Sequence, residues 1–83
     1  MIYIVVASAT YAIKARNLLN KNNIKCETCQ TPSTIAGRKC SYSIVIADKK
    51  YYQKSIDIVS NNNCYLLGVY ESRDGGMYEY VLE

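Results

Sequence analysis

Three observations on the sequence predict an α+β fold with one four-stranded sheet and two helices. The chain has 83 residues, which suits one domain, and 49% of them are hydrophobic, which suffices for one core. Apolar stretches of strand length alternate with two segments of helical periodicity. Their order is strand, helix, strand, strand, helix, strand (βαββαβ). Right-handed crossovers in this order give the ferredoxin-like split sandwich, with both helices on one face of an antiparallel sheet.

The first two elements are expected to be a strand and a helix. Residues 2–7 are apolar on both faces, which is typical of a central strand. From about residue 11 to residue 22, apolar positions recur with helical spacing. A hydroxyl of Ser8 or Thr10 can cap this helix, and Asn22-Asn23 can end it because asparagine tolerates the left-handed conformation.

A polar strand and a long loop are expected next. Residues 24–30 form a strand that we place at a sheet edge, and Pro32 stops it because proline donates no backbone hydrogen bond. Residues 32–39 are the longest irregular stretch, and long loops in small domains often carry function. An apolar third strand follows over residues 42–47.

The second helix and the fourth strand complete the core. Asp48 can cap the helix, and Tyr52, Ile56 and Val59 give its buried stripe. Residues 64–71 are again apolar and form the fourth strand.

A short extension follows the fourth strand. Asp74-Gly75-Gly76 is a hairpin signal, so residues 77–82 are expected to form a fifth strand beside the fourth or an arm onto another subunit. We therefore expect a single domain over residues 1–83, with a core at 1–71 and a C-terminal β-hairpin extension at 72–83.

Composition narrows the classes of function. There is no histidine, which excludes a Cys-His catalytic pair, an imidazole metal site and the usual general base near neutral pH. The net charge of +3 is too small and scattered to indicate a nucleic acid or a membrane as partner. No apolar run has the length of a membrane span, and the amino terminus enters a strand without a signal-peptide pattern. We expect a cytoplasmic protein in which the four cysteines are reduced.

The loop before the third strand carries the best candidate for chemistry. Gly37 can adopt backbone conformations that other residues avoid. Arg38 and Lys39 place positive charge beside Cys40, which favours the thiolate, and the thiolate is the nucleophile. The alternative is that Cys40 is an ordinary strand residue with basic neighbours.

The other cysteines have less favourable settings. Cys26 and Cys29 have the spacing of redox and zinc motifs, but in a strand such residues point to opposite faces. We therefore expect no metal site, and we interpret Cys26 and Cys64 as small apolar residues of the sheet. Cys29 lies near the end of the second strand, so a reversible Cys29–Cys40 disulfide, with Cys29 as the resolving thiol, is one hypothesis.

The sheet surface opposite the helices is expected to be apolar, and such a patch is typical of oligomer or partner surfaces. The alternating pattern of the strands does not decide which set of residues faces the helices. The candidate positions are Tyr3, Val5, Val45, Leu67 and Val69. Self-association through this face or through the C-terminal strand is one expectation, and a regulatory or assembly module that binds a partner or small ligand there is an alternative function.

An RNA-binding module of the same topology is a further alternative. Ile2-Tyr3-Ile4 is similar to the first aromatic motif of that fold, and Tyr42 lies on the third strand, where the second motif belongs. The second motif needs a basic residue before glycine and further aromatic residues, whereas Gly37 here precedes Arg38. Nucleic acid is therefore not favoured.

Over roughly residues 1–71, the chain resembles a small bacterial family of selenium/sulfur carrier-like proteins, a domain of otherwise unknown function. The resemblance rests on an ordered set of features rather than on one motif. These are the first strand leading to Ser8, the helix Ala12–Leu19, the strand end Thr31-Pro32-Ser33, the segment Cys40-Ser41-Tyr42-Ser43-Ile44 and the final Gly68-Val69-Tyr70. The chain departs from the family pattern at Ser41, where glycine is usual, and at Arg16 and Asn17, where an acidic residue is common.

The resemblance implies a carrier rather than an enzyme with turnover. A family cysteine, matched here by Cys40, would take sulfur or selenium from a donor protein as a persulfide or selenopersulfide and pass it to an acceptor protein. Arg38 and Lys39 would stabilise the anion, and Pro32, Gly37 and Ser41 would shape the loop. This chemistry needs no cofactor.

Overall fold

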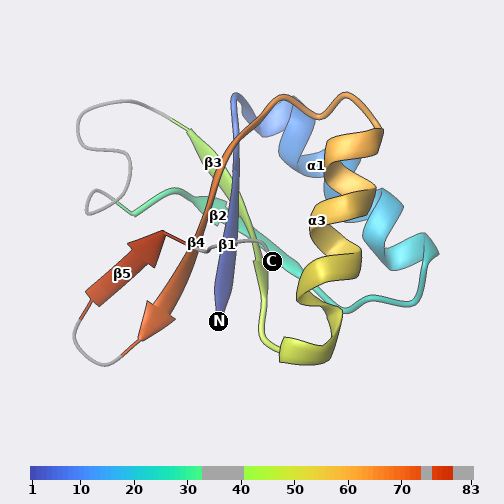
Figure 1. The fold of residues 1–83 in the computed structure, drawn as a ribbon. Coiled ribbons are helices and arrows are strands. Elements are labelled where there is room, and N and C mark those ends of the chain that lie inside the picture. Colours follow the sequence, from blue (N-terminus) through green and yellow to red (C-terminus); the bar gives the residue numbers. More distant parts are fainter. Residues whose placement is uncertain (33–40, 74–75, 80–83) are drawn as a thin grey trace.

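The computed structural model describes residues 1–32, 41–73 and 76–79. The sheet order is β2-β3-β1-β4-β5, and each neighbouring pair is antiparallel. Two helices cover one face of this sheet (Figure 1). The elements are β1 (Ile2–Val6), α1 (Ala9–Lys21), β2 (Glu27–Gln30), β3 (Tyr42–Ile46), the 3-10 turn η1 (Lys49–Tyr51), α3 (Tyr52–Asn61), β4 (Leu66–Arg73) and β5 (Gly76–Glu79). The predicted ferredoxin-like arrangement is confirmed, including the edge position of β2 and the central position of β1.

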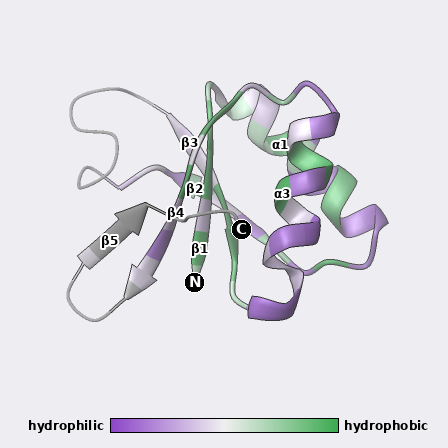
Figure 2. Cartoon of the chain, viewed as in Figure 1, coloured by the Kyte–Doolittle hydropathy of each residue, from purple (hydrophilic) through white to green (hydrophobic). Residues whose placement is uncertain are grey.

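The core lies between the sheet and the two helices. Ile2, Ile4 and Val6 of β1 are fully buried in it, and β1 is hydrophobic along most of its length (Figure 2). The remaining core residues of the sheet and helices are Ile44, Ile46, Val69, Ala12, Ala15, Leu19, Tyr52, Ile56 and Val59. Ala12 and Ala15 of α1 are buried in this core. Within the described residues, no helix is long and apolar enough to cross a membrane.

α1 ends in a Schellman motif. Because the chain is still part of this helix cap at residue 24, β2 begins later than the predicted strand 24–30. Asn23 has a positive φ of 62°, as expected for the residue after the helix. The Ile24 amide then donates to the Leu19 carbonyl at 2.9 Å, and the Asn23 amide donates to that of Asn20 at 3.0 Å. Ile24 is buried as part of this cap, so the strand begins at Glu27 rather than at residue 24.

The predicted capping residues Ser8 and Asp48 act differently from what the sequence suggests. Ser8 is the residue before α1, but its side chain makes no capping hydrogen bond; its carbonyl accepts from the Ala12 amide at 3.0 Å. Asp48 does cap, with its carboxylate accepting from the Lys50 amide at 3.2 Å. It caps η1, and α3 continues from that turn at Tyr52.

A fifth strand beside the fourth is confirmed as β5 (Gly76–Glu79), whereas residues 80–82 of the predicted strand lie outside the described residues. β5 pairs with β4 through the register Tyr70–Glu79 to Arg73–Gly76. The turn residues Asp74 and Gly75 lie outside the described residues. A single domain over residues 1–83, divided into a core at 1–71 and an extension at 72–83, stays a prediction.

Candidate functional site

The candidate site is the end of the sheet where β2 leads towards β3. Cys29 lies opposite Ser43, and the pairing continues beyond the strand ends, because the Thr31 amide donates to the Ser41 carbonyl at 2.9 Å. Pro32 follows directly and has no amide hydrogen to extend the ladder. The predicted loop residues Gly37, Arg38, Lys39 and Cys40 lie outside the described residues. The predicted Pro32 and Ser41 thus stand on either side of the loop.

A buried pair of hydroxyl groups braces this end of the sheet. Thr31 Oγ1 and Ser43 Oγ are 2.8 Å apart, and both side chains are buried. A hydrogen bond in a dry environment is hard to replace, because either hydroxyl alone would be left without a partner. The sequence analysis missed this pair. It could be found only once the register between β2 and β3 was fixed, since threonine and serine are common on strands.

Two of the described thiols belong to the core. Cys26 packs against α1, with its Sγ 3.9 Å from the Arg16 carbonyl and 3.8 Å from Asn20 Oδ1. Burial raises the pKa of Cys26 despite the positive charge of Arg16 nearby. Burial likewise raises the pKa of Cys64 despite Lys14. Their burial confirms the interpretation of both as small apolar residues, but the prediction that they belong to the sheet is wrong, because Cys26 precedes β2 and Cys64 precedes β4.

Cys29 lies on the opposite side of the sheet from Cys26. It is partly buried opposite Ser43, and burial raises its pKa as well. The Cys26–Cys29 spacing therefore does not bring two thiols together, as the strand periodicity predicts. No group of potential metal ligands occurs among residues 1–32, 41–73 and 76–79. The pairing of Cys29 with Cys40 stays a prediction, because Cys40 is outside the described residues.

The structure shows which of the alternating strand residues face the helices and which face the opposite side of the sheet. Val69 is part of the core, whereas Val5 pairs with Ser43 on the opposite face. Val5 is itself buried, so this face is not a bare apolar surface. Leu67 is 61% exposed and has no partner on β1, because the register shifts between Val5–Gly68 and Val6–Leu66. Self-association through this face stays a prediction.

The sheet faces on which Tyr3 and Tyr42 lie test the alternative of an RNA-binding module. Such a module presents its aromatic residues together on the exposed sheet face. Tyr42 instead pairs with Val6 and packs against the core, on the side of the helices. Tyr3 pairs with Val45 and alternates with the buried Ile2 and Ile4, so it lies on the other face. The two tyrosines do not form a stacking platform.

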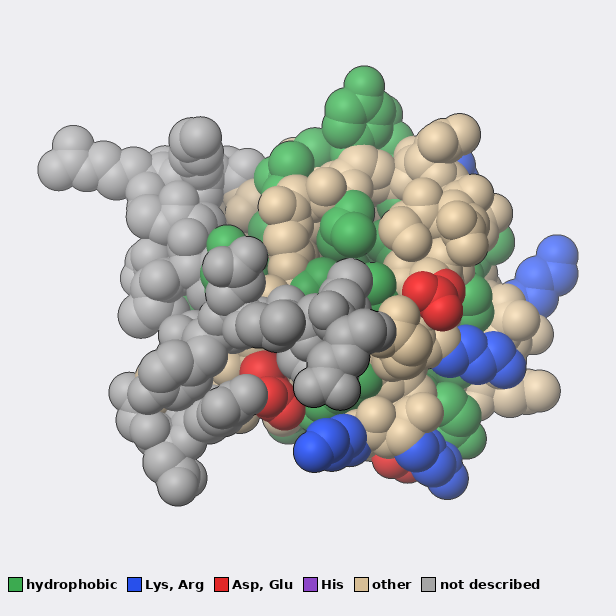
Figure 3. All heavy atoms as spheres, viewed as in Figure 1, with side chains coloured by type: hydrophobic (Ala, Val, Ile, Leu, Met, Phe, Trp, Pro, Cys, Tyr) green, Lys and Arg blue, Asp and Glu red, His purple; other side chains and the backbone are tan. Residues whose placement is uncertain are grey.

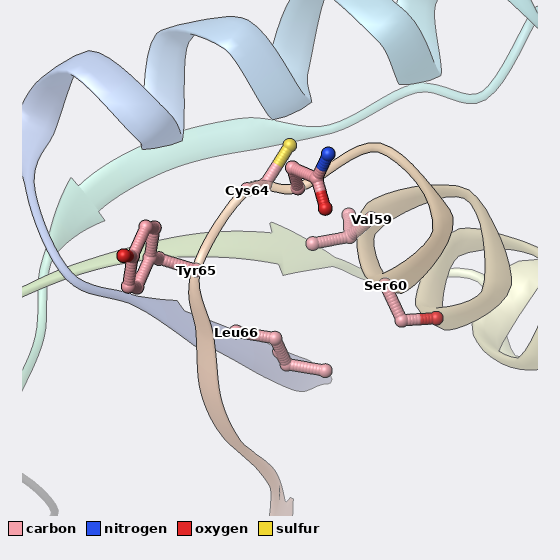
Figure 4. A pocket seen from close by; sticks show the side chains of 6 residues that line it. Val59, Ser60, Cys64, Tyr65 and Leu66 are labelled. Carbon is pink, nitrogen blue, oxygen red and sulfur yellow. The ribbon is translucent and has the colours of Figure 1, made fainter.

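The connection from α3 to β4 holds a strained residue that the sequence did not reveal. Tyr65 has a positive φ of 52° and is 64% exposed, although bulky residues rarely adopt this conformation. Its ring contacts that of Tyr11 at a centroid distance of 5.1 Å. Figure 4 shows Tyr65 and Cys64 projecting in different directions beside a pocket of about 500 Å³. Hydrophobic side chains gather at this upper end of the molecule in Figure 3.

Substituting Tyr65 tests the strain. Tyr65→Gly and Tyr65→Ala both remove the ring contact, but only glycine adopts a positive φ without steric cost. The glycine variant is therefore expected to be more stable than the alanine variant by about 1 kcal/mol. Urea unfolding of both proteins measures the difference. Equal stabilities would show that the backbone at this position is not strained.

The comparisons with known proteins identify the family. Residues 1–71 match the family model described as "Putative Se/S carrier protein-like". The match includes all of β1, α1, β2, β3 and α3 and most of β4, and the chain belongs to this family. No curated protein and no solved structure matches the chain.

Proposed function

We propose that this protein carries sulfur or selenium on Cys40 as a persulfide or selenopersulfide, between donor and acceptor proteins in the cytoplasm. Membership of the carrier-like family supports the class of function. The observation that most favours Cys40 is the state of the other three thiols. Burial raises the pKa of Cys26, Cys29 and Cys64, so each supplies less of the reactive thiolate than a thiol in water does.

The surroundings of Cys40 in the sequence suit this role. Arg38 and Lys39 precede it, and positive charge favours both a thiolate and a terminal chalcogenide anion. Ser41, the next residue, is buried, and its carbonyl accepts the Thr31 amide. The reactive residue would therefore be one peptide unit from an anchored position of the sheet.

The transfer needs no external oxidant or reductant. The Cys40 thiolate attacks the terminal sulfur of a donor persulfide, forming a new sulfur–sulfur bond as the donor's own sulfur–sulfur bond breaks. The donor leaves as a thiolate, and the proton of the persulfide stays on the transferred sulfur. An acceptor thiolate then repeats the exchange and releases the Cys40 thiolate. Selenium follows the same route, with a sulfur–selenium bond in place of the terminal sulfur–sulfur bond.

Loading by a cysteine desulfurase tests the proposal. Incubation of the protein with the desulfurase and free cysteine should add one sulfur atom, seen as a mass increase of the intact protein. Peptide mapping should place it on Cys40, and a thiol reductant should remove it. No mass increase, with either the desulfurase or a small-molecule persulfide as donor, would contradict the carrier function.

A further inference from the structure

A second surface, on the outer side of α1, has features that the carrier chemistry does not use. Its side chains recur at spacings of three and four residues over three turns, so they lie on one stripe of the helix. The stripe forms a shallow groove of about 420 Å³. It is lined by Thr10, Ile13, Lys14, Asn17, Leu18 and Lys21.

The floor of this α1 groove is apolar. Ile13 is 48% exposed and supplies the accessible apolar surface, whereas Leu18 is partly buried and also packs against the core. α1 lies beside α3 in the helical layer that covers one face of the sheet (Figure 1). A helix that carries a second regular stripe offers ridges and grooves of the kind into which another helix packs.

The charged side chains of the α1 groove are all positive. No aspartate or glutamate occurs in the first 26 residues, which contain α1 entirely. Lys14 and Lys21 are exposed on the groove, and neither forms an ion pair with a described residue. The ion pair between Lys50 and Asp48 is elsewhere, at the start of η1. The groove therefore presents two cations beside an apolar floor.

We propose that the α1 groove binds an acidic amphipathic helix of a partner protein. Apolar residues of that helix would pack on Ile13 and Leu18, and its carboxylates would pair with Lys14 and Lys21. A second copy of this chain is a poor occupant, because it would bring the same lysines together. Single-stranded nucleic acid usually stacks on aromatic residues, and the groove has none. A membrane surface calls for more apolar area than the exposed side chain of Ile13 provides.

A synthetic peptide tests this proposal. The probe is a helical peptide of about 14 residues with leucines at helical spacing and glutamates flanking them. Binding is followed by backbone amide shifts of isotope-labelled protein under reducing conditions. Shifts should cluster on residues 10–21, and raising the salt from about 0.05 to about 0.5 M should weaken binding, because exposed charges are screened. The double variant K14E/K21E should weaken binding at least about tenfold.

Matched variants and competitors decide the outcome. K49E/K54E makes the same charge change on exposed lysines of η1 and α3 and should alter binding less than about twofold. Equal weakening by both double variants, or shifts that map away from α1, would overturn the proposal. So would tighter binding of single-stranded RNA or anionic vesicles that K14E/K21E abolishes, since the groove would then serve another class of partner. Peptide binding does not require Cys40, so a failure of sulfur loading would leave this test unaffected.

Discussion

Cys40→Ser is expected to abolish the mass increase that a cysteine desulfurase produces in the wild-type protein. A serine hydroxyl is not appreciably ionised near neutral pH and does not exchange with a persulfide, so the variant has no acceptor atom at this position. The three remaining thiols should not substitute for it, because burial raises the pKa of each. Intact-mass analysis after loading measures the effect.

Cys29→Ser is the matched control for Cys40→Ser. Cys29 is the most accessible of the three described thiols, yet it should load little, so its replacement should leave the mass increase in place. Alkylation at mildly acidic pH gives an independent reading, with Cys40 labelled before Cys26, Cys29 and Cys64. Undiminished loading of Cys40→Ser would move the carrier role to another cysteine. Loss of loading in Cys29→Ser alone would make Cys29 the carrier.

Breaking the buried Thr31–Ser43 hydroxyl pair is expected to destabilise the fold more than the loss of a hydroxyl at the surface. Thr31→Val or Ser43→Ala leaves the other hydroxyl buried without its partner, which costs about 1–3 kcal/mol. The double variant removes both hydroxyls and should cost clearly less than the sum of the single changes. Urea unfolding of the four proteins measures the cycle.

An exposed serine provides the reference for this cycle. Ser60 makes a hydrogen bond from its Oγ to the Asp57 carbonyl at 3.2 Å, but at the surface, where water can replace it. Ser60→Ala should therefore change the free energy of unfolding by less than about 0.5 kcal/mol. Strictly additive costs for Thr31→Val and Ser43→Ala would mean that the two hydroxyls do not depend on each other.

The fold could be predicted from the sequence because its signals are local and agree with one another. The apolar run of β1, the helical stripe of α1 and the left-handed tolerance of Asn23 each depend on neighbouring residues only. The prediction was wrong by a few residues where a buried residue belongs to a turn. Ile24 completes the cap of α1, and Cys64 lies between two residues with positive φ, Asn63 and Tyr65.

The candidate site could be predicted only in part, because its contacts join distant segments. The sequence places Pro32 at the end of β2 and Ser41 before β3, and the structure agrees. It does not specify the register that brings Thr31 near Ser43, since a shift of one residue would exchange the faces of the strand. The strain at Tyr65 is invisible for a similar reason, because tyrosine is unfavourable in that conformation and only the surrounding structure imposes it.

The fifth strand has a consequence for the solubility of the chain. β4 has eight residues and carries the exposed Leu67, and the family match ends within it, at residue 71. A long strand whose backbone donors and acceptors face water is a template for the strands of other molecules. By pairing with β4 over Tyr70–Arg73, the much shorter β5 occupies the C-terminal half of that template, so the extension beyond residue 71 shortens the stretch of β4 with which strands of other molecules can pair.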